Sequence, residues 1–302
     1  MLVPLVPLVR SSRSSRSSRS SRSSTGRATT HHLGSTMAYF FRTGATTFRA
    51  SPHVGGAWRS DEQHVAPALG LLAHVVETDR VDRGRDDLAV SRLAYDIWGV
   101  FPIGDVETRV RVLRPGRGVE LVEAKLWCAG RCAVSLRAWL ARTGDTADLA
   151  GGAPAPVPGP DRTPPWDPAT VWPGGFIDSI EVRRTAVEPG RATVWVRTDV
   201  RLVADEEVGP LARTAGLLDA ANGMAVRADP REVAFPNVDL AAHLFRAPLG
   251  GWVGLDTSVV FGPAGAGVTH STLHDEAGPF GTLAQALVVR SLAAPEGAST
   301  GA

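Results

Sequence analysis

The chain has 302 residues, of which 43% are hydrophobic and 21% charged, and its formal net charge is +1. This length suffices for two ordinary domains or one large one, and the composition is that of a globular protein. Residues 1–36 contain six arginines and no acid, so the remainder is net acidic, which argues against nucleic acid as the main partner of the folded part.

Residues 1–36 begin with a short apolar stretch and continue as a Ser/Arg repeat. The apolar stretch contains prolines and is too short to span a membrane, and no later run is long enough either. The repeat cannot bury apolar surface, so it predicts disorder. It is either a nucleic-acid-binding arm or, as we favour, an upstream extension with Met37 as the true start.

The segment from Met37 predicts a strand over residues 38–50 and then a buried helix with Pro67 in its first helical position, where the missing N–H costs little. Turns containing Pro or Gly then separate four strand-like runs, at residues 88–100, 105–115, 119–129 and 132–143. Cys128 and Cys132 flank the last turn; we interpret them as reduced thiols, with a disulfide across the hairpin as the alternative.

Residues 143–174 are rich in Pro and Gly and predict an extended linker. Beyond it we expect two more strands, at 176–187 and 191–203, and a second helix that begins at Pro210 and ends near Asn222 and Gly223. Residues 235–290 predict a further four strands, and residues 293–302 a disordered tail.

The two halves repeat one layout. Leu93 and Ala94 follow the first helix as Leu240 and Ala241 follow the second. A period this long indicates two copies of one unit, a helix with an antiparallel meander, rather than a solenoid. Two such units can join their sheets edge to edge.

Two polar residues break this repeat. Aligned on the Leu-Ala pair, Asp239 falls opposite Arg92; aligned on the glycine turns, Gln285 falls opposite Arg137. Burying a lone carboxylate or amide costs on the order of several kcal/mol. We therefore predict that Asp239 and Gln285 hold a water between them, at one site in the later copy.

At these residues the chain resembles the double-hotdog acyl-CoA thioesterases, in particular the bacterial type II enzyme and related proteins of actinobacteria. The resemblance rests on HVGGAWRSDEQHVAPALGLLAHVVE from His53, VWVR from Val194, an Asp-x-x-Asn-like helix end at Asp219 and Asn222, VDLAAHLFRAP from Val238, WVGLD, and Gln285. It implies an α+β double hotdog, with one hotdog unit at residues 37–142 and the other at residues 175–292.

The resemblance also implies a trio of Asp, Gln and Thr that positions the attacking water. The Asp carries over to Asp239 and the Gln to Gln285, whereas the Thr has no clean match and Thr257 is its nearest hydroxyl. Asp239 would be the general base, and backbone N–H groups at a helix start would bind the oxyanion. Neither a metal nor a cofactor is expected.

Further contacts with substrate are predicted for a few side chains. Arg197 and Arg246 would bind the coenzyme phosphates, and His64 would contact the substrate. Trp58 or Trp252 would line the acyl pocket. The alternatives are that Asp239 is a structural acid paired with Arg246 or Arg197, that Gln285 is a satisfied core amide, and that His64 is simply solvated.

The resulting hypothesis is a cytoplasmic acyl-CoA thioesterase of lipid metabolism, with its reaction at the junction of the two units. The folded part would bind acyl-thioesters and neither nucleic acid nor membrane, and a homo-oligomer of double-hotdog units stays open. The alternative function is an acyl-thioester-binding protein with little turnover. A third hypothesis is a nucleic-acid-binding or tethering protein that depends on the Ser/Arg arm.

Overall fold

The computed structural model describes residues 37–56 and 58–292, which belong to one compact unit. The predictions for the Ser/Arg segment at residues 1–36 and for the tail at residues 293–302 lie outside the described residues. Within the described part, no helix is long and apolar enough to cross a membrane.

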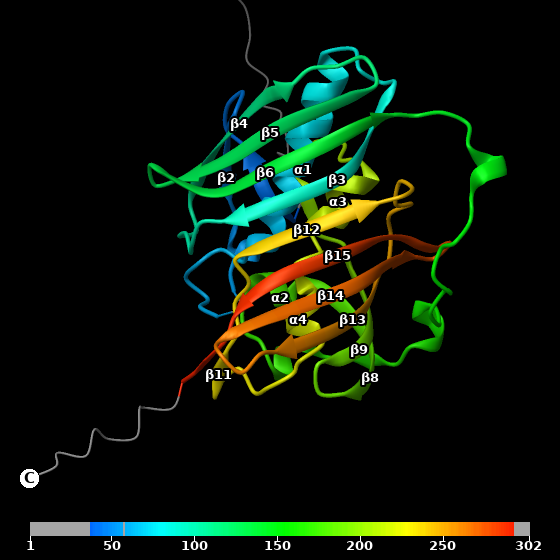
Figure 1. The fold of residues 1–302 in the computed structure, drawn as a ribbon. Coiled ribbons are helices and arrows are strands. Elements are labelled where there is room, and N and C mark those ends of the chain that lie inside the picture. The colour runs from blue at the N-terminus through cyan, green and yellow to red at the C-terminus, as the bar shows by residue number, and fades with distance from the viewer. Residues whose placement is uncertain (1–36, 57, 293–302) are drawn as a thin grey trace, which may run out of the picture. The chain divides into compact units, whose positions relative to one another are not determined.

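One sheet of fourteen strands runs through the described part of the chain, in the order β10-β1-β2-β4-β5-β6-β3-β12-β15-β14-β13-β9-β8-β7. Figure 1 shows the strands as one broad layer with the helices behind it. The first-half strands are β1 (Ala38–Arg42), β2 (Thr47–Ala50), β3 (Leu88–Ile97), β4 (Asp105–Arg114), β5 (Val119–Cys128) and β6 (Arg131–Arg142). The others are β7 (Pro165–Trp166), β8 (Ile180–Glu188), β9 (Arg191–Thr198), β10 (Arg201–Val203), β12 (Asp239–Leu244), β13 (Val253–Phe261), β14 (Ala266–Asp275) and β15 (Gly278–Val288). A small separate sheet pairs β11 (Val233–Ala234) with β16 (Arg290–Ser291).

The two halves join at the antiparallel pair β3–β12 and at the parallel pair β1–β10, in which β10 of the second half lies beside β1 of the first. The register of the β3–β12 pair supports the predicted repeat. Ala94 lies opposite Ala241, while Leu93 faces Ala242 and Tyr95 faces Leu240. If Leu93 is equivalent to Leu240 and Ala94 to Ala241, each pair of facing residues has an equivalent pair in the same ladder. A pseudo-twofold axis therefore passes between Ala94 and Ala241. The predicted fold class, an α+β double hotdog with two antiparallel units in one chain, is confirmed.

The predicted alignment of Gln285 with Arg137 is wrong by one residue. Arg137 pairs with Ala94, whereas the residue that pairs with Ala241 is Ala284. The pairings in the two hairpins shift at different places, near Trp127 in one and near His274 in the other. Because a shift of one residue reverses the face of a strand, the counterpart of Gln285 is the buried residue Ala138 and not the outward Arg137.

The first helix is α1 (Val65–Asp82). Almost all residues of its first three turns are buried, and it packs against β3–β6. It begins two residues before the predicted start, with His64 as its N-cap and Pro67 in its third position. The first N–H groups of a helix have no intrahelical partner, so proline is tolerated there as well as in the first position. The helix is therefore longer than its proline suggested.

The second helix starts at Pro210 as predicted, but it is broken into α3 (Pro210–Ala215) and α4 (Ala220–Met224). A further short helix, α2 (Gly175–Asp178), precedes β8. Helices α1 and α3 approach closely through Gly70 and Gly216: a Cβ on Gly70 would lie 2.9 Å from the Gly216 Cα. This contact aligns Gly70-Leu71-Leu72-Ala73 with Gly216-Leu217-Leu218-Asp219, so the counterpart of Asp219 is Ala73.

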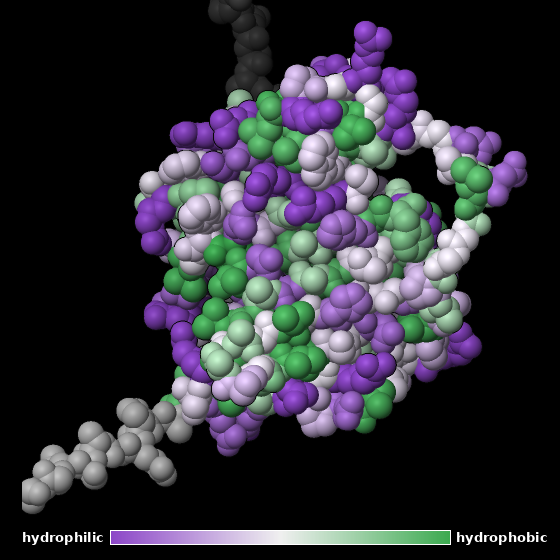
Figure 2. Space-filling model, viewed as in Figure 1, coloured by the Kyte–Doolittle hydropathy of each residue, from purple (hydrophilic) through white to green (hydrophobic). Residues whose placement is uncertain are grey.

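The outer face of the sheet is open, and Figure 2 shows apolar residues gathered over part of β13–β15. Val260, Val268 and Val288 are exposed there. Within the predicted linker, Trp166 of β7 pairs with Val182 of β8 and extends the sheet by one edge strand. The core lies on the inner face, between the sheet and the helices.

Candidate active site

A cavity of about 350 Å³ is lined by both halves of the protein. The first half contributes the start of α1 and the segment after β3, and the second half contributes α4 and the segment before β12. Its walls are largely apolar. Its lining residues include Trp58, His64, Val65, Asp219, Asn237 and Arg290.

Asp219 is the buried acid of this cavity. It lies at the N-cap of α4 and is 7% exposed. Its Oδ1 accepts two hydrogen bonds, from Asn237 Nδ2 at 2.7 Å and from Gln285 Nε2 at 3.1 Å. Both amides therefore hold the carboxyl group by one oxygen.

The other carboxyl oxygen of Asp219, Oδ2, receives no hydrogen bond from any described residue; it lies 3.7 Å from His64 Nδ1. Burial raises the pKa of Asp219 to about 7, and the hydrogen bonds from Asn237 and Gln285 oppose this rise. A carboxyl group with a pKa near neutrality and a free oxygen can take a proton from water at neutral pH.

The start of α1 faces this acid. The His64 side chain caps the helix, because its Nδ1 accepts the Ala66 N–H at 3.1 Å. The ring also stacks on Phe176, with the ring centroids 4.2 Å apart. Val65, the first helical residue, lines the cavity, and its N–H bonds to no described residue. A backbone donor is thus available at the helix end that favours negative charge.

The predicted pairing of Asp239 with Gln285 is wrong, because the two side chains lie on opposite faces of the sheet. Gln285 is buried on the inner face of β15 with Leu283 and Leu287 and alternates with exposed residues, whereas Asp239 lies outward, next to the buried Leu240. Asp239 Oδ1 instead accepts the backbone N–H of Ala286 at 2.6 Å. The alternative pairing of Asp239 with Arg246 or Arg197 is not found either, because these arginines pair with Asp275 and Glu181.

Thr257 and the two predicted phosphate ligands also lie away from the cavity. Thr257 is buried in β13, where its hydroxyl bonds to that of Ser271 at 2.7 Å. Arg246 makes two 2.6 Å bonds to Asp275. Arg197 pairs with Glu181 and lies over Trp252. Neither arginine lines the cavity around Asp219.

Trp58 and His64 line the cavity, and their contact with substrate stays a prediction. Trp58 is 41% exposed and makes edge-to-face contacts with Trp172 at 4.9 Å and with Phe235 at 5.4 Å. This aromatic cluster gives one wall of the cavity a large apolar surface.

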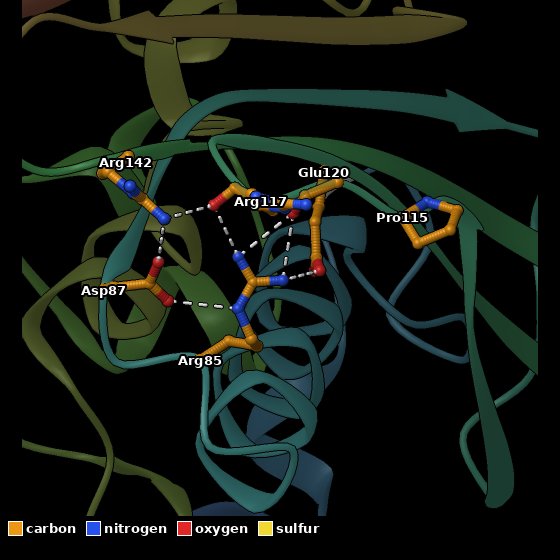
Figure 3. A pocket seen from close by; sticks show the side chains of 7 residues that line it. Arg85, Asp87, Pro115, Arg117, Glu120 and Arg142 are labelled. Atoms are coloured by element: carbon orange, nitrogen blue, oxygen red, sulfur yellow. Dashed lines mark hydrogen bonds and ion pairs between the residues drawn. The ribbon is translucent and has the colours of Figure 1, made fainter.

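A second pocket, of about 450 Å³, is rich in arginine but serves the fold (Figure 3). Arg85 bonds to Glu120 and Asp87 and to the carbonyls of Gly116 and Arg117. Arg142 bonds to Asp87 and to the Arg117 carbonyl. Because these partners already engage both guanidinium groups, the cluster ties the β4–β5 turn to the end of α1.

The sequence does not single out Asp219 and Asn237 as site residues. Asp219 contributes only to a helix-end motif there, although it is an acid inside the otherwise apolar run Gly216–Ala221. That context was the available signal. Asn237 had none, since an Asn after a proline is ordinary turn chemistry.

The first half carries no equivalent of this polar group. Under the pseudo-twofold, the counterparts of Asp219, Asn237 and Gln285 are Ala73, Val90 and Ala138. The double hotdog therefore has one such carboxyl–amide group within the described residues. Nor do three His, Cys, Asp or Glu side chains of residues 37–56 and 58–292 cluster as a metal site would require.

Solved structures with a similar fold cover most of the chain. A hot dog fold protein from Alicyclobacillus acidocaldarius has a TM-score of 0.65 at 13% identity, over 84% of this chain and 96% of its own. Acyl-CoA thioesterase II TesB2 from Mycobacterium marinum has a TM-score of 0.60 at 15% identity, over 85% and 97%. A protein from Novosphingobium aromaticivorans has a TM-score of 0.62 at 23% identity, over 83% and 98%.

At the sequence level, no curated protein matches the chain. Two family models do match: the acyl-CoA thioesterase N-terminal domain at residues 54–141 and the acyl-CoA thioesterase C-terminal domain at residues 153–289. Together they span both hotdog units and the cavity between them. The chain belongs to the double-hotdog acyl-CoA thioesterase family, and it is a thioester hydrolase.

Proposed function

We propose that the protein hydrolyses acyl-CoA thioesters with a water activated by Asp219, oriented by Asn237 and Gln285. The observation that carries this proposal is the buried Asp219 carboxyl, which has one oxygen bound by two amides and the other free. Two fixed donors on Oδ1 hold the group in one orientation, so Oδ2 is the atom that accepts the water proton. In this proposal, Asn237 has the role that the family resemblance assigns to a threonine.

The N-terminus of α1 supports the same reaction from the opposite wall. The Val65 N–H makes no hydrogen bond to a described residue, so it is available to developing negative charge on the thioester oxygen. The base comes from the second hotdog unit and this donor from the first. The reaction therefore needs both units, and it lies at their junction.

For the coenzyme phosphates we propose Arg290 in place of Arg197 and Arg246. Arg290 is exposed, lines the cavity and has no ion pair with a described residue. A cation without a partner at the rim is available to a phosphate. The expected cytoplasmic location is supported by Cys128 and Cys132, which are free thiols, and a role in lipid metabolism would follow from the substrate.

Release of free thiol from a panel of acyl-CoAs of increasing chain length tests the proposed function. We expect turnover, with a preference set by the cavity of about 350 Å³. Full-length protein should be compared with a chain that begins at Met37, and both should be active. Tight binding of acyl-CoAs without thiol release would instead favour an acyl-thioester-binding protein.

The variant Arg290→Ala tests the phosphate site. It should raise KM for acyl-CoA about fivefold, which corresponds to roughly 1 kcal/mol for an exposed charge pair, and leave kcat unchanged. The same acyl group on N-acetylcysteamine, which has no phosphate, should show no change in KM. Arg246→Ala is the matched control; an equal rise of KM in both variants would contradict the assignment.

A further inference from the structure

His64 is held in one orientation at the cavity wall. On one side, its Nδ1 accepts the Ala66 N–H at 3.1 Å and caps α1. On a second side, the ring stacks on Phe176 at an interplanar angle of 30°. The backbone N–H of His64 is fixed as well, because it bonds to the Val54 carbonyl at 2.7 Å. The imidazole is therefore a rigid group rather than a solvated loop side chain.

These contacts decide which ring nitrogen carries the proton. A nitrogen that accepts a hydrogen bond uses its lone pair, so Nδ1 is unprotonated and the proton of the neutral ring is on Nε2. Burial lowers the pKa of His64 to about 3, which keeps the ring neutral at working pH. Nε2 has no hydrogen-bond partner among the described residues.

We propose that the Nε2–H of His64 is a catalytic donor that binds the thioester carbonyl oxygen and stabilises the oxyanion beside the Val65 N–H. This inference rests on the proposed function and deepens it. The side chain lines the same cavity as Asp219, from the other hotdog unit. A neutral donor suits this task, because it adds no charge that would pair with the Asp219 carboxylate and weaken it as a base.

The reaction balances with these groups alone. The water oxygen forms a bond to the thioester carbon while Asp219 Oδ2 takes a water proton. The carbonyl π electrons move to the oxygen, where His64 Nε2–H and Val65 N–H donate to the resulting oxyanion. Collapse of this intermediate breaks the carbon–sulfur bond, and the proton on Asp219 passes to the leaving thiolate. The products are a carboxylic acid and the free thiol.

His64 has two functions that substitution can separate. In asparagine, the amide oxygen is as far from the backbone as Nδ1 is in histidine. His64→Asn therefore keeps a capping acceptor for the Ala66 N–H and loses the Nε2–H donor. A glutamine amide lies at the distance of Nε2, so His64→Gln keeps a donor and loses the cap. The two variants form a matched pair in one position of the full-length protein.

We expect opposite orders for stability and rate. His64→Asn should keep a Tm near that of the wild type, while its kcat falls about 10²- to 10³-fold with little change in KM. His64→Gln should have the lower Tm and retain kcat within about tenfold of the wild type. A trifluoromethyl ketone analogue of the substrate, whose hydrate resembles the intermediate, should bind His64→Asn more weakly, whereas a thioether analogue should bind both proteins equally.

Two results would overturn the assignment. Wild-type kcat in His64→Asn would mean that His64 only caps the helix. A rise of KM with kcat unchanged would mean that it binds substrate and transition state alike. The wild-type rate in the same assay reports on the proposed function separately, because thiol release by the wild type shows hydrolysis whatever the variants do.

Discussion

Asp219→Asn is expected to lower kcat about 10²- to 10⁴-fold, the usual contribution of a general base. The substitution changes one atom in the carboxyl group. The new amide oxygen can still accept the hydrogen bonds from Asn237 and Gln285, so the site keeps its shape. What is lost is the ability to take a proton from water. Steady-state thiol release measures the effect, and KM should change little.

Asp239→Asn is the matched control for this prediction. Asp239 bonds to the Ala286 N–H on the outer face of the sheet, and an amide oxygen can accept the same bond. Its kcat should therefore stay close to that of the wild type. If Asp239→Asn removed activity while Asp219→Asn did not, the assignment of the base would be reversed.

Thermal unfolding distinguishes loss of chemistry from loss of structure. The folded-state pKa of Asp219, about 7, lies above its ordinary value of 3.8. The unfolded chain therefore loses this proton first as the pH rises, and the stability of the wild type decreases between about pH 4 and pH 7. Asp219→Asn removes this decrease. Above pH 7 the inactive variant should have a Tm at least as high as the wild type.

The pH dependence of kcat/KM is the second large effect. Asp219 is active only as the carboxylate, so kcat/KM should rise with pH and level off above an apparent pKa of about 7. At pH 5, about two units below that pKa, activity should be roughly 100-fold lower than on the plateau. An ordinary exposed aspartate would give no such limb above pH 5.

Gln285→Leu tests how far the hydrogen bond from Gln285 limits the rise in the pKa of Asp219. The amide of Gln285 favours the charged form of Asp219 by donating to Oδ1. Its removal should therefore shift the rise of kcat/KM toward higher pH, by about one pH unit. Thr257→Val, which alters a buried hydroxyl outside the cavity, should leave the limb in place. An equal shift in the rise of kcat/KM in both variants would indicate a general effect on the fold.

The elements of the fold could be predicted because their signals are local. Prolines and glycines marked the four strands from residue 235 onward, and β12–β15 follow that pattern. Pro210 opens α3 as predicted. Some errors were of one or two residues, at the start of α1 and in the alignment of Gln285. Both arise because the contacts that fix helix starts and strand register are tertiary. Others were larger: the predicted second helix is broken into α3 and α4, and the strands predicted at residues 38–50 and 191–203 are each divided in two, into β1 and β2 and into β9 and β10.

The candidate site was half predicted, since Gln285, His64 and Trp58 line or adjoin the cavity while Asp239, Thr257, Arg197 and Arg246 do not. The prediction of Asp239 depends on its place as a lone carboxylate at the start of a strand and on the family resemblance. Whether it shares a face with Gln285 depends on the pairing of β12 with β15, which no single stretch of sequence encodes.

By itself, the sequence determined that one module occurs twice and that its later copy carries polar groups that the earlier copy lacks. Those facts depend on the order of residues along the chain. Only the tertiary structure points to Asp219 as the proposed base, because it brings residues 64, 219 and 237 to one cavity and places Gln285 within hydrogen-bond distance of Asp219. Burial there raises the pKa of one carboxyl group toward neutrality, and burial is a property of the packed chain rather than of any segment.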